Sequence, residues 1–565
     1  MPDERATTKS PPAPTDRAET LVDLLDRLDG PGGAGSSGRP DRTGLRLLDR
    51  RERARFLPWR EVHERAIRTA GRLAALGIEP GDRVALIHPT GEELFDALFG
   101  ALLAGAAPVP LYPPVRLGRL DEYHRRTARM VEAAGARVVL ADRRVRRLLG
   151  PMVERAQPEL GCPVLDELPE ASPGPLDRSR RPGRPGGDDL AMVQFSSGTT
   201  VDPKPVALSH RAILAQVRLL NGFWPDRETT IHSGVSWLPL YHDMGLIGCV
   251  FPALERIADL TLIGPEVFVA RPAVWLRAIS RYRATISPAP NFAYGLCVSK
   301  IRDRDLEGVD LSSWRVALNG AEAVSAGTLR AFTERFGRYG FRPEALTPVY
   351  GLSEAALAVT FSSLEQPFVS RRFERESLEP GAAVRPAGPA PDPATDRDGG
   401  SPPVARELVS VGTPLPDFAV QVREPSADGA AASARPLPDG RVGRVWVRGP
   451  SLMTGYLGRP EATRRALVDG WLDTGDLGFV WEGELYLTGR AKDVVIVRGR
   501  NVAPEEIEAA AARAPGARAG CAVAASWTPD LDPDPELPSD SEELAVFVER
   551  ARDADASDLK GLAKA

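Results

Sequence analysis

The chain has 565 residues, of which 42% are hydrophobic and 26% charged, and its formal net charge is −5 at pH 7. This length and composition predict a globular protein with a large buried core and more than one domain. The weakly acidic balance gives no electrostatic support for binding nucleic acid or an acidic membrane surface.

Cysteine and histidine usage indicates neither a metal site nor a disulfide framework. The four cysteines lie far apart along the chain, and the six histidines form no zinc motif. We therefore expect free thiols and a reducing, cytoplasmic location. The polar N-terminus lacks the apolar core of a signal peptide. The most apolar stretch, residues 97–112, is interrupted by glycine and proline and is too short to span a bilayer.

Helical and strand patterns alternate over the first two thirds of the chain. Residues 1–18 are rich in proline, hydroxyl and charged residues, which predicts disorder. Helices are then expected at 21–28, 59–76, 94–103 and 130–134, and strands at 83–87, 108–111, 137–140 and 190–195. This alternation continues to about residue 361 and predicts a mostly parallel α/β sheet.

The last third has a different pattern. Residues 378–405 are rich in proline, alanine, glycine and aspartate, which predicts a long exposed insertion. Short strands separated by turns follow from 408 to 447, and Glu482-Gly483 predicts a hairpin. A strand at 494–497 and a helix at 505–512 come last. The expected fold is α/β, with a large N-terminal domain of stacked α/β subdomains, a small β-rich subdomain and a short C-terminal α/β domain.

A cluster of hydroxyl residues follows the strand at 190–195. It reads Ser196-Ser197-Gly198-Thr199-Thr200, and Lys204 comes after it. Glycine allows a close backbone turn, and hydroxyl and N–H donors beside a mobile cation suit a polyphosphate. The alternative is a Ser/Thr-rich surface turn. Only six of the 72 basic residues are lysine, which gives Lys204 added weight.

Here the sequence resembles the adenylate-forming superfamily of acyl- and aryl-CoA ligases, luciferases and adenylation domains. The superfamily's phosphate loop reads Ser/Thr-Ser-Gly-Ser/Thr-Thr-Gly-x-Pro-Lys-Gly. Val201 and Pro205 stand where that pattern has glycine, which predicts a stiffer loop. Further motifs follow in the family's order, and the resemblance covers nearly the whole chain from about Leu21.

The segment Tyr241-His242-Asp243-Met244-Gly245 resembles fatty acyl-AMP ligases in particular. The resemblance implies that His242 stands at the gate between the nucleotide and the carboxylate substrate, whereas a lone histidine between apolar flanks is otherwise structural. Asn291, Phe292 and Tyr294 would line a hydrocarbon tunnel, and ordinary core is the alternative for that segment.

The resemblance also implies a nucleotide site. Gly320, Ala321 and Glu322 would bind adenine, with the aromatic of Tyr350-Gly351-Leu352-Ser353-Glu354 packing on its ring. Glu354, helped by Thr200, would hold a Mg²⁺ ion between the carboxylate and the phosphates, whereas a solvated acid is the alternative. Asp476, rather than Asp473, matches the ribose ligand.

Three further residues take their roles from the resemblance. Arg490 matches a contact to ribose and phosphate, Asp493 matches the hinge of the C-terminal domain, and Gly499 would lie where a pantetheine approaches. The implied domains are 19–490, with an insertion at 362–408, and a partial C-terminal domain at 491–565.

The pattern breaks near the end of the chain. The superfamily closes with a Gly-Lys segment whose lysine bridges the carboxylate and the α-phosphate. The last lysines, Lys560 and Lys564, lack that context. We expect the final part of the C-terminal domain to be missing, and a truncated chain, a fragment, a weakened enzyme and a lysine from elsewhere all stay open.

The leading hypothesis is ATP- and Mg²⁺-dependent activation of a fatty acid to an acyl-adenylate, with His242, Glu354 and Lys204 as catalytic residues. Positioning and charge neutralisation would be the protein's contribution. The acyl group would pass to the phosphopantetheine of an acyl carrier protein, and the insertion would restrain domain rotation. The alternatives are an acyl-CoA synthetase using coenzyme A, an amino-acid adenylation domain, and a non-catalytic nucleotide- or acyl-binding relative.

Overall fold

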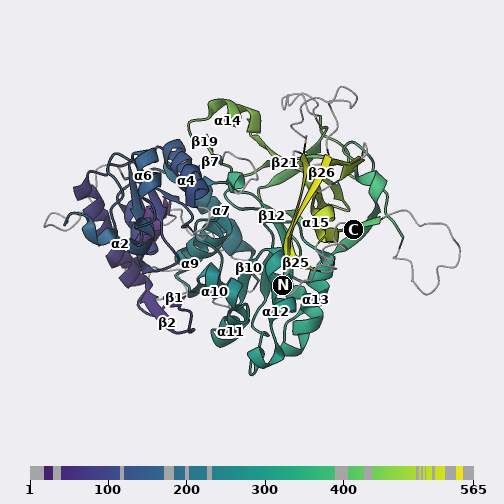
Figure 1. The fold of residues 1–565 in the computed structure, drawn as a ribbon, viewed down its shortest axis with the longest axis horizontal. Coiled ribbons are helices and arrows are strands. Elements are labelled where there is room, and N and C mark those ends of the chain that lie inside the picture. Colours follow the sequence, from purple (N-terminus) through teal and green to yellow (C-terminus); the bar gives the residue numbers. More distant parts are fainter. Residues whose placement is uncertain are drawn as a thin grey trace, which may run out of the picture.

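The structure is a computed structural model. It describes residues 18–29, 40–114, 120–170, 184–196, 203–225, 232–388, 405–425, 435–491, 495–497, 500–502, 504–511, 514, 516–527 and 543–550. Figure 1 shows the N-terminal helices on one side of the molecule and the β-rich C-terminal part on the other, with the large sheet between them.

The first subdomain contains a three-stranded parallel sheet of order β4-β3-β5, with strands β3 (Arg83–Ile87), β4 (Ala107–Pro110) and β5 (Val138–Ala141). Its helices are α1 (Leu21–Asp26), α2 (Trp59–Leu76), α3 (Glu92–Leu103), α4 (Leu120–Ala134), α5 (Arg143–Arg146) and α6 (Gly150–Ala156). Helix α2 ends at Gly77, whose φ of 99° is the left-handed conformation that glycine adopts at helix ends.

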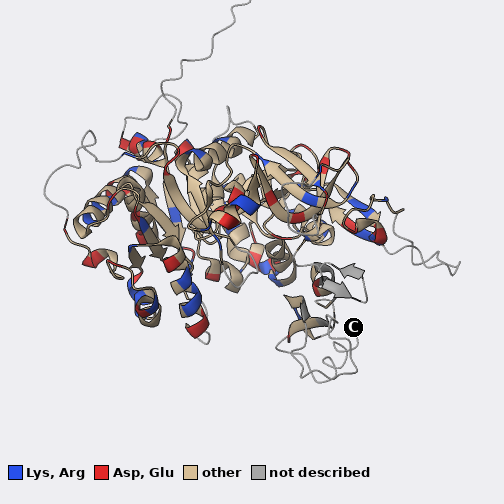
Figure 2. Ribbon diagram, turned by 90° about the horizontal axis from the view of Figure 1, so that it is seen from above, with Lys and Arg blue, Asp and Glu red and all other residues tan. Residues whose placement is uncertain are grey.

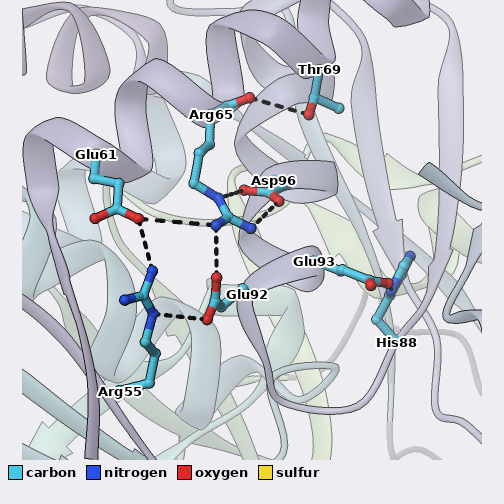
Figure 3. Close-up of polar contacts among 8 residues, drawn as sticks. All are labelled: Arg55, Glu61, Arg65, Thr69, His88, Glu92, Glu93 and Asp96. Carbon is cyan, nitrogen blue, oxygen red and sulfur yellow. Dashed lines mark hydrogen bonds and ion pairs between the residues drawn. The ribbon is translucent and has the colours of Figure 1, made fainter. Parts of the chain in front are cut away.

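Helices α2 and α3 are joined by an ionic cluster (Figure 3). Arg65 of α2 makes two hydrogen bonds of 2.8 and 2.7 Å to Asp96 and one of 2.6 Å to Glu92, both on α3. Arg55 also contacts Glu92, at 3.2 Å. This bidentate arginine geometry holds the two helices in register.

Strand β6 (Leu190–Phe195) connects this subdomain to the candidate phosphate loop. It pairs antiparallel with β7 (Pro205–Ser209), which in turn pairs antiparallel with the short β19 (Gly455–Tyr456). The helix α7 (His210–Phe223) follows β7, and the Ser209 hydroxyl caps it by accepting from Ala212 N at 3.2 Å.

The central sheet has nine strands in the order β16-β13-β12-β11-β10-β8-β9-β1-β2. They are β1 (Gly44–Leu48), β2 (Ala54–Pro58), β8 (Gly234–Ser236), β9 (Leu260–Ile263), β10 (Ile286–Ala289), β11 (Val316–Asn319), β12 (Leu346–Gly351), β13 (Ala358–Phe361) and β16 (Thr413–Pro414). The adjacent strands in the middle of the sheet, in the order β12-β11-β10-β8-β9-β1, all pair in parallel. At the edges, β1 pairs antiparallel with β2, and β13 pairs antiparallel with both β12 and β16. Parallel strands align their carboxyl ends, where α/β proteins bind ligands.

Further helices connect these strands. They are α8 (Asp243–Gly245), a π-helical turn (Leu246–Val250), α9 (Phe251–Arg256), α10 (Pro265–Ala270), α11 (Ala273–Arg281), α12 (Asn291–Lys300) and α13 (Ala326–Phe336). One aromatic core packs under α11, α12 and α13, and includes the fully buried Trp275, Tyr294, Trp314 and Phe332.

The β-rich subdomain contains β17 (Ala419–Arg423), β18 (Gly443–Arg448), β20 (Leu467–Val468), β21 (Trp471–Trp481) and β22 (Glu484–Arg490), with α14 (Pro460–Ala466) beside them. Strands β23 (Val495–Val497), β24 (Arg500–Val502), β25 (Ala517–Trp527) and β26 (Glu543–Arg550) and helix α15 (Pro504–Ala511) follow. Strands β23 and β24 pair with each other, and so do β25 and β26.

The predicted α/β fold is confirmed, and the bounds of α2, β3 and β6 agree with those expected from the sequence. Two expectations differ. Strand β6 is antiparallel to its partner β7, because only the residues from 196 to 204 separate the two strands, fewer than a crossover between parallel strands needs. The predicted exposed insertion begins with a packed segment, in which Leu378 and Val384 are buried against β22 through Tyr486.

Figure 2 shows basic and acidic residues interspersed along the described ribbon. Within the described part of the chain, no helix combines the length and the apolar character needed to cross a membrane.

Candidate active site

A single large cavity gathers most of the residues that the sequence motifs predict. It is lined by segments that follow β8, β10, β11 and β12 in the central sheet, and by residues of β21 and β22 in the β-rich subdomain. The predicted residues in its wall are Ser196, Lys204, His242, Asn291, Phe292, Ala321, Glu322, Tyr350, Gly351, Leu352, Ser353, Glu354, Asp476 and Arg490. The cavity therefore lies at the carboxyl ends of the parallel strands, where the topology of the sheet favours a ligand.

One wall of the cavity carries a carboxylate held by two partners. The hydroxyl of Tyr350, at the end of β12, donates to Asp476 Oδ2 at 2.6 Å, and Arg490 Nε donates to Asp476 Oδ1 at 3.1 Å. Burial and the neighbouring Asp476 carboxylate raise the pKa of Tyr350 well above its usual value, so its phenol stays a hydrogen-bond donor. These bonds join the central sheet to β21 and β22.

The neighbouring Asp473 has a different environment. Its carboxylate accepts three hydrogen bonds of 3.1, 3.0 and 2.8 Å from Arg444 on β18. This bidentate ion pair occupies both oxygens of Asp473. The geometry thus separates the two acids of the motif, and Asp476 is the one set beside Tyr350 and Arg490.

A second carboxylate lies near the candidate phosphate loop. Glu354 Oε1 accepts a hydrogen bond of 2.9 Å from the hydroxyl of Tyr456, and Lys204 Nζ lies 4.6 Å from the centre of the Tyr456 ring. Burial raises the pKa of Glu354, although the Tyr456 hydroxyl and the charge of Lys204 both oppose that shift. Strand pairing explains the arrangement, because Tyr456 on β19 lies opposite Val206 on β7, two residues after Lys204.

The predicted gate histidine lies against the buried carboxylate of Asp243. His242 Nδ1 lies 2.6 Å from Asp243 Oδ1, and the side chain of His242 is 33% exposed. Asp243 Oδ2 accepts a hydrogen bond of 2.6 Å from the Ser353 hydroxyl. The charge of Asp243 raises the pKa of His242 against the opposing effect of burial.

The chain turns tightly after this histidine. A Cβ on Gly245 would lie 2.2 Å from the carbonyl oxygen of Pro239, so only glycine fits there. The π-helical turn Leu246–Val250 follows directly. Such turns are rare and frequently found at functional sites.

Helix α12 supplies a further wall of the cavity. Phe292, Gly295, Leu296 and Ser299 all line it and lie on one face of the helix at helical spacing. Phe292 is 45% exposed, and the centre of its ring lies 5.8 Å from that of Trp237 in an edge-to-face arrangement. Asn291 also lines the cavity, and its side-chain oxygen accepts a 3.1 Å hydrogen bond from Ser325 N.

The structure does not bring Tyr294 to the cavity. Its side chain is fully buried, its hydroxyl donates to Leu318 O at 2.9 Å, and its ring stacks parallel to Trp314. Tyr294 therefore lies in the aromatic core behind α12, because it occupies the opposite face of that helix. The predicted tunnel role finds no support in this placement.

The predicted adenine segment follows β11. A Cβ on Gly320 would lie 2.7 Å from Val349 Cγ2, so glycine is needed there for close contact between β11 and β12. The next residue, Ala321, has a φ of 67° and lies in the cavity wall. Glu322 Oε1 accepts a 2.5 Å hydrogen bond from Phe292 N, which satisfies an N–H in the first turn of α12.

Some predicted residues lie outside the described part of the chain. They are Ser197, Gly198, Thr199, Thr200, Asp493 and Gly499. The described ends of the candidate phosphate loop are Ser196 and Lys204, both in the cavity wall, and Ser196 N donates to Lys204 O at 3.2 Å.

Two residues of the site were missed by sequence reasoning. Tyr456 carries no local signal, since only the pairing of β19 with β7 brings it to Glu354. The sequence motif assigns no role to Asp243, yet this residue contacts both His242 and Ser353. An acid directly after the gate histidine was the available signal.

The residues present suit a magnesium nucleotide. Glu354 offers a partly buried carboxylate at the cavity wall, and the charge of Lys204 acts on it. Among the described residues, no group of three or more potential metal ligands occurs together. Magnesium commonly binds one or two protein carboxylates and completes its shell with phosphate oxygens and water. The donor set therefore fits an ion shared with a polyphosphate rather than an all-protein metal cage.

Comparison with known proteins agrees with this geometry. Residues 36–457 match the family model of AMP-binding enzymes. A putative acyl-CoA synthetase of Caulobacter vibrioides is 34% identical over 92% of this chain and 85% of its own length. A long-chain fatty acid–AMP ligase of Mycobacterium marinum is 34% identical over 88% and 82% of the two chains. A medium-chain fatty acid–acyl-carrier-protein ligase of Moorena producens is 33% identical over 80% and 74%.

A solved structure extends the similarity to three dimensions. The fatty acyl-adenylate ligase from Legionella pneumophila, in complex with acyl adenylate and pyrophosphate, has a TM-score of 0.73 and 30% sequence identity to this chain. The match covers 97% of this chain and 89% of that one. The chain belongs to the AMP-binding, adenylate-forming enzyme family and resembles the fatty acyl-AMP ligases within it.

Proposed function

We propose that this protein is a fatty acyl-AMP ligase. A carboxylate oxygen of a fatty acid attacks the α-phosphorus of ATP, the bond to the β-phosphate oxygen breaks, and pyrophosphate leaves with its electron pair. The acyl-adenylate is then attacked by a thiol, which releases AMP. One observation carries this proposal. A single cavity is lined by the carboxylate of Asp476, by Lys204 with Glu354, and by the apolar face of α12.

The nucleotide end of the cavity lies between the central sheet and the β-rich subdomain. Asp476, oriented by Tyr350 and Arg490, would accept hydrogen bonds from the two ribose hydroxyls. Residues from Ser196 to Lys204 would bind the β- and γ-phosphates, and Ala321 and Tyr350 would contact adenine. These contacts would place the α-phosphate near His242, and such positioning would lower the entropic part of the barrier.

The acyl end lies along α12. Phe292, Leu296 and the backbone at Gly295 would contact the hydrocarbon chain. His242, at the junction of the two ends, would hold the carboxylate close to the α-phosphate. Glu354 would hold a magnesium ion, with Thr200 as the second protein ligand. When bound, that ion supplies positive charge that offsets the negative charge on the phosphates.

The thiol acceptor is proposed to be the phosphopantetheine of an acyl carrier protein rather than coenzyme A. The relative from Moorena producens, named as an acyl-carrier-protein ligase, supports the first acceptor. The relative from Caulobacter vibrioides, named as a putative acyl-CoA synthetase, supports the second. The insertion at 362–408 favours the carrier protein, because it packs through Phe373 against Phe479 and Tyr486 and would limit rotation beyond β22.

We also propose the domain division expected from the motifs. Residues 19–490 would form the AMP-binding domain, and the chain would rotate about Asp493. The described elements after Arg490 support a separate unit, because they pair among themselves and Ala524 N donates to Glu508 Oε1 of α15 at 3.0 Å. The free cysteines Cys162, Cys249, Cys297 and Cys521 support a cytoplasmic location.

The test is a product assay. The protein is incubated with ATP, Mg²⁺ and fatty acids of increasing length, pyrophosphate release is measured, and the product is identified by mass. Holo-acyl carrier protein and coenzyme A are supplied in parallel. We expect acyl-AMP with the acid alone and transfer to the carrier protein only. Formation of acyl-CoA would indicate a synthetase, and ATP binding without any adenylate would indicate a non-catalytic relative.

A further inference from the structure

The residue that follows the gate histidine is a buried acid. Asp243 is 5% exposed and lies at the start of the short helix α8, beside the cavity. A buried carboxylate is costly unless its oxygens are hydrogen-bonded or paired with a positive charge. The partners of Asp243 therefore indicate what this residue does.

Both oxygens of Asp243 have partners. Oδ1 accepts from Met244 N at 2.7 Å and lies 2.6 Å from His242 Nδ1. Oδ2 accepts from the Ser353 hydroxyl at 2.6 Å. The two short side-chain contacts point in different directions, one toward the gate and one toward the Tyr350–Glu354 segment.

We propose that Asp243 is a positioning residue, which holds His242 as a charged imidazolium facing the fatty carboxylate and links this gate to the segment that carries Glu354. The inference rests on the proposed function, because it assigns His242 a carboxylate substrate. It adds a residue that acts through His242 and a physical connection between the acid and nucleotide ends of the cavity.

The orientation of the imidazole follows from the first contact. His242 Nδ1 lies 2.6 Å from Asp243 Oδ1 and 3.4 Å from Met244 N, which could donate to that nitrogen only if it carried no proton. The much shorter contact with the carboxylate favours a proton on Nδ1, which leaves Nε2 on the other side of the ring for a second partner. With both nitrogens protonated, Nε2–H can donate a charge-assisted hydrogen bond to a carboxylate substrate. A neutral ring protonated on Nδ1 alone would instead turn a lone pair toward that carboxylate and repel it.

The charges around His242 favour the imidazolium. Asp243 lies in direct contact with it, Glu354 contributes a second carboxylate to the cavity, and Lys204 contributes an opposing positive charge. Asp243 dominates, so the pKa of His242 is raised despite burial. Burial opposes the ionisation of Asp243, but His242, Ser353 and Met244 N together lower its pKa. Each partner thus stabilises the charge of the other.

The second contact reaches the nucleotide side. Ser353 directly precedes Glu354, and the same segment begins at Tyr350, which bonds to Asp476. A shift of this segment on nucleotide binding would therefore change the positions of Asp243 and His242. Coupling of this kind is reciprocal, so bound nucleotide should tighten acid binding by the same factor as bound acid tightens nucleotide binding.

The test measures equilibrium binding of dodecanoic acid by calorimetry, with and without a non-hydrolysable ATP analogue, across a range of pH. For the wild-type protein we expect the Kd to be lowest at pH values where the fatty acid is ionised and His242 is protonated, and to rise as pH passes the pKa of His242. In Asp243→Asn the imidazolium loses its counter-ion, so the rise should begin at lower pH, and the Kd at neutral pH should increase about tenfold. In Ser353→Ala the pH dependence of the Kd should match that of the wild type. The ATP analogue should lower the Kd for the acid by a smaller factor than in the wild type.

A matched control separates these effects from loss of fold. Asp96→Asn removes one carboxylate from the cluster around Arg65 between α2 and α3 (Figure 3). Arg65 keeps Glu92 as a partner in this variant. It should leave the Kd and its pH dependence unchanged. The inference is overturned if Asp243→Asn binds the acid with the wild-type Kd and pH profile, or if Ser353→Ala retains full coupling. Failure of the wild-type protein to bind any fatty acid would instead overturn the proposed function.

Discussion

The hydroxyl of Tyr350 lies 2.6 Å from Asp476 Oδ2, although the two residues are 126 positions apart in the chain. This bond connects the end of β12 in the central sheet to β21 in the β-rich subdomain. Asp476 is 8% exposed, and Arg490 is the second partner of its carboxylate. These two bonds fix the carboxylate of Asp476 at the cavity wall.

The first prediction concerns the two acids of this motif. Asp476→Asn should raise the KM for ATP by at least about tenfold, because hydrogen bonds to a charged acceptor contribute about 1.5–3 kcal/mol each. Asp473→Asn is the matched control, since Asp473 pairs with Arg444. It should lower the Tm but leave the KM for ATP near the wild-type value. Equal effects of the two substitutions on the KM would contradict the assignment.

The second prediction concerns Tyr456. Tyr456→Phe removes the hydroxyl that donates to Glu354 but keeps the ring under Lys204. The pKa of Glu354, already raised by burial, should rise further because a hydrogen bond that favours the carboxylate is lost. Glu354 must be ionised to hold a cation, so activity is lost as pH falls through its pKa. The acid limb of the pH–rate profile should therefore move to higher pH.

The same substitution should also increase the Mg²⁺ concentration needed for half-maximal rate. Tyr456→Leu, which removes the ring as well, should produce a larger effect on the KM for ATP, because Lys204 loses its aromatic contact. If the acid limb and the Mg²⁺ requirement of Tyr456→Phe match those of the wild type, Tyr456 does not act on Glu354.

The third prediction concerns the length of the acyl site. Gly295 lies mid-way along α12 in the cavity wall, and a Cβ there would meet only Thr328 Cγ2, at 3.6 Å. Gly295→Ala should therefore be tolerated, whereas Gly295→Leu should fill part of the channel. Steady-state kinetics with a series of fatty acids should show that Gly295→Leu loses long acids and keeps short ones. A uniform loss for all lengths would place Gly295 outside the acyl channel.

The fourth prediction concerns stability at acidic pH. His88 directly follows β3 and is 3% exposed, and burial lowers its pKa to about 4 despite the charge of Asp142. His88 Nδ1 lies 3.9 Å from Glu93 Oε2, and Figure 3 shows both side chains. The unfolded chain binds a proton near pH 6.5, whereas the folded chain does not until about pH 4. The free energy of unfolding should therefore decrease as pH is lowered from 6.5 to 4, by up to about 3 kcal/mol for this residue.

Urea unfolding at several pH values measures this effect. His88→Leu removes the titrating group without adding a polar atom to the site. The variant should lose less stability than the wild type between pH 6.5 and pH 4. A parallel decline in both proteins would show that other groups cause the acid sensitivity.

Local patterns predicted much of the fold. The bounds of α2 follow from an amphipathic pattern ended by Gly77, and the hairpin of β21 and β22 follows from Glu482-Gly483. The pairing of β19 with β7 was not predicted, because it joins two short segments almost 250 residues apart. A two-residue strand such as Gly455–Tyr456 has no periodicity that sequence reasoning can detect.

Residues that stand in continuous motifs could be named from the sequence, whereas residues that meet only in space could not. Glu354, Asp476 and His242 all line the cavity, and their roles there stay predictions. Tyr294 does not, because a helix presents neighbouring residues to different faces and the motif alone does not say which face is which. Tyr456 and the Ser353–Asp243 bond depend on tertiary packing.

The most direct test of the account is fatty-acid-dependent exchange of labelled pyrophosphate into ATP by the wild-type protein and by Asp476→Asn. Exchange reports reversible acyl-adenylate formation and needs no thiol acceptor. We predict exchange that requires both the fatty acid and Mg²⁺ and that falls strongly in Asp476→Asn. Absence of exchange with every acid, in a folded protein that binds ATP, would contradict the central claim that this cavity forms an acyl-adenylate.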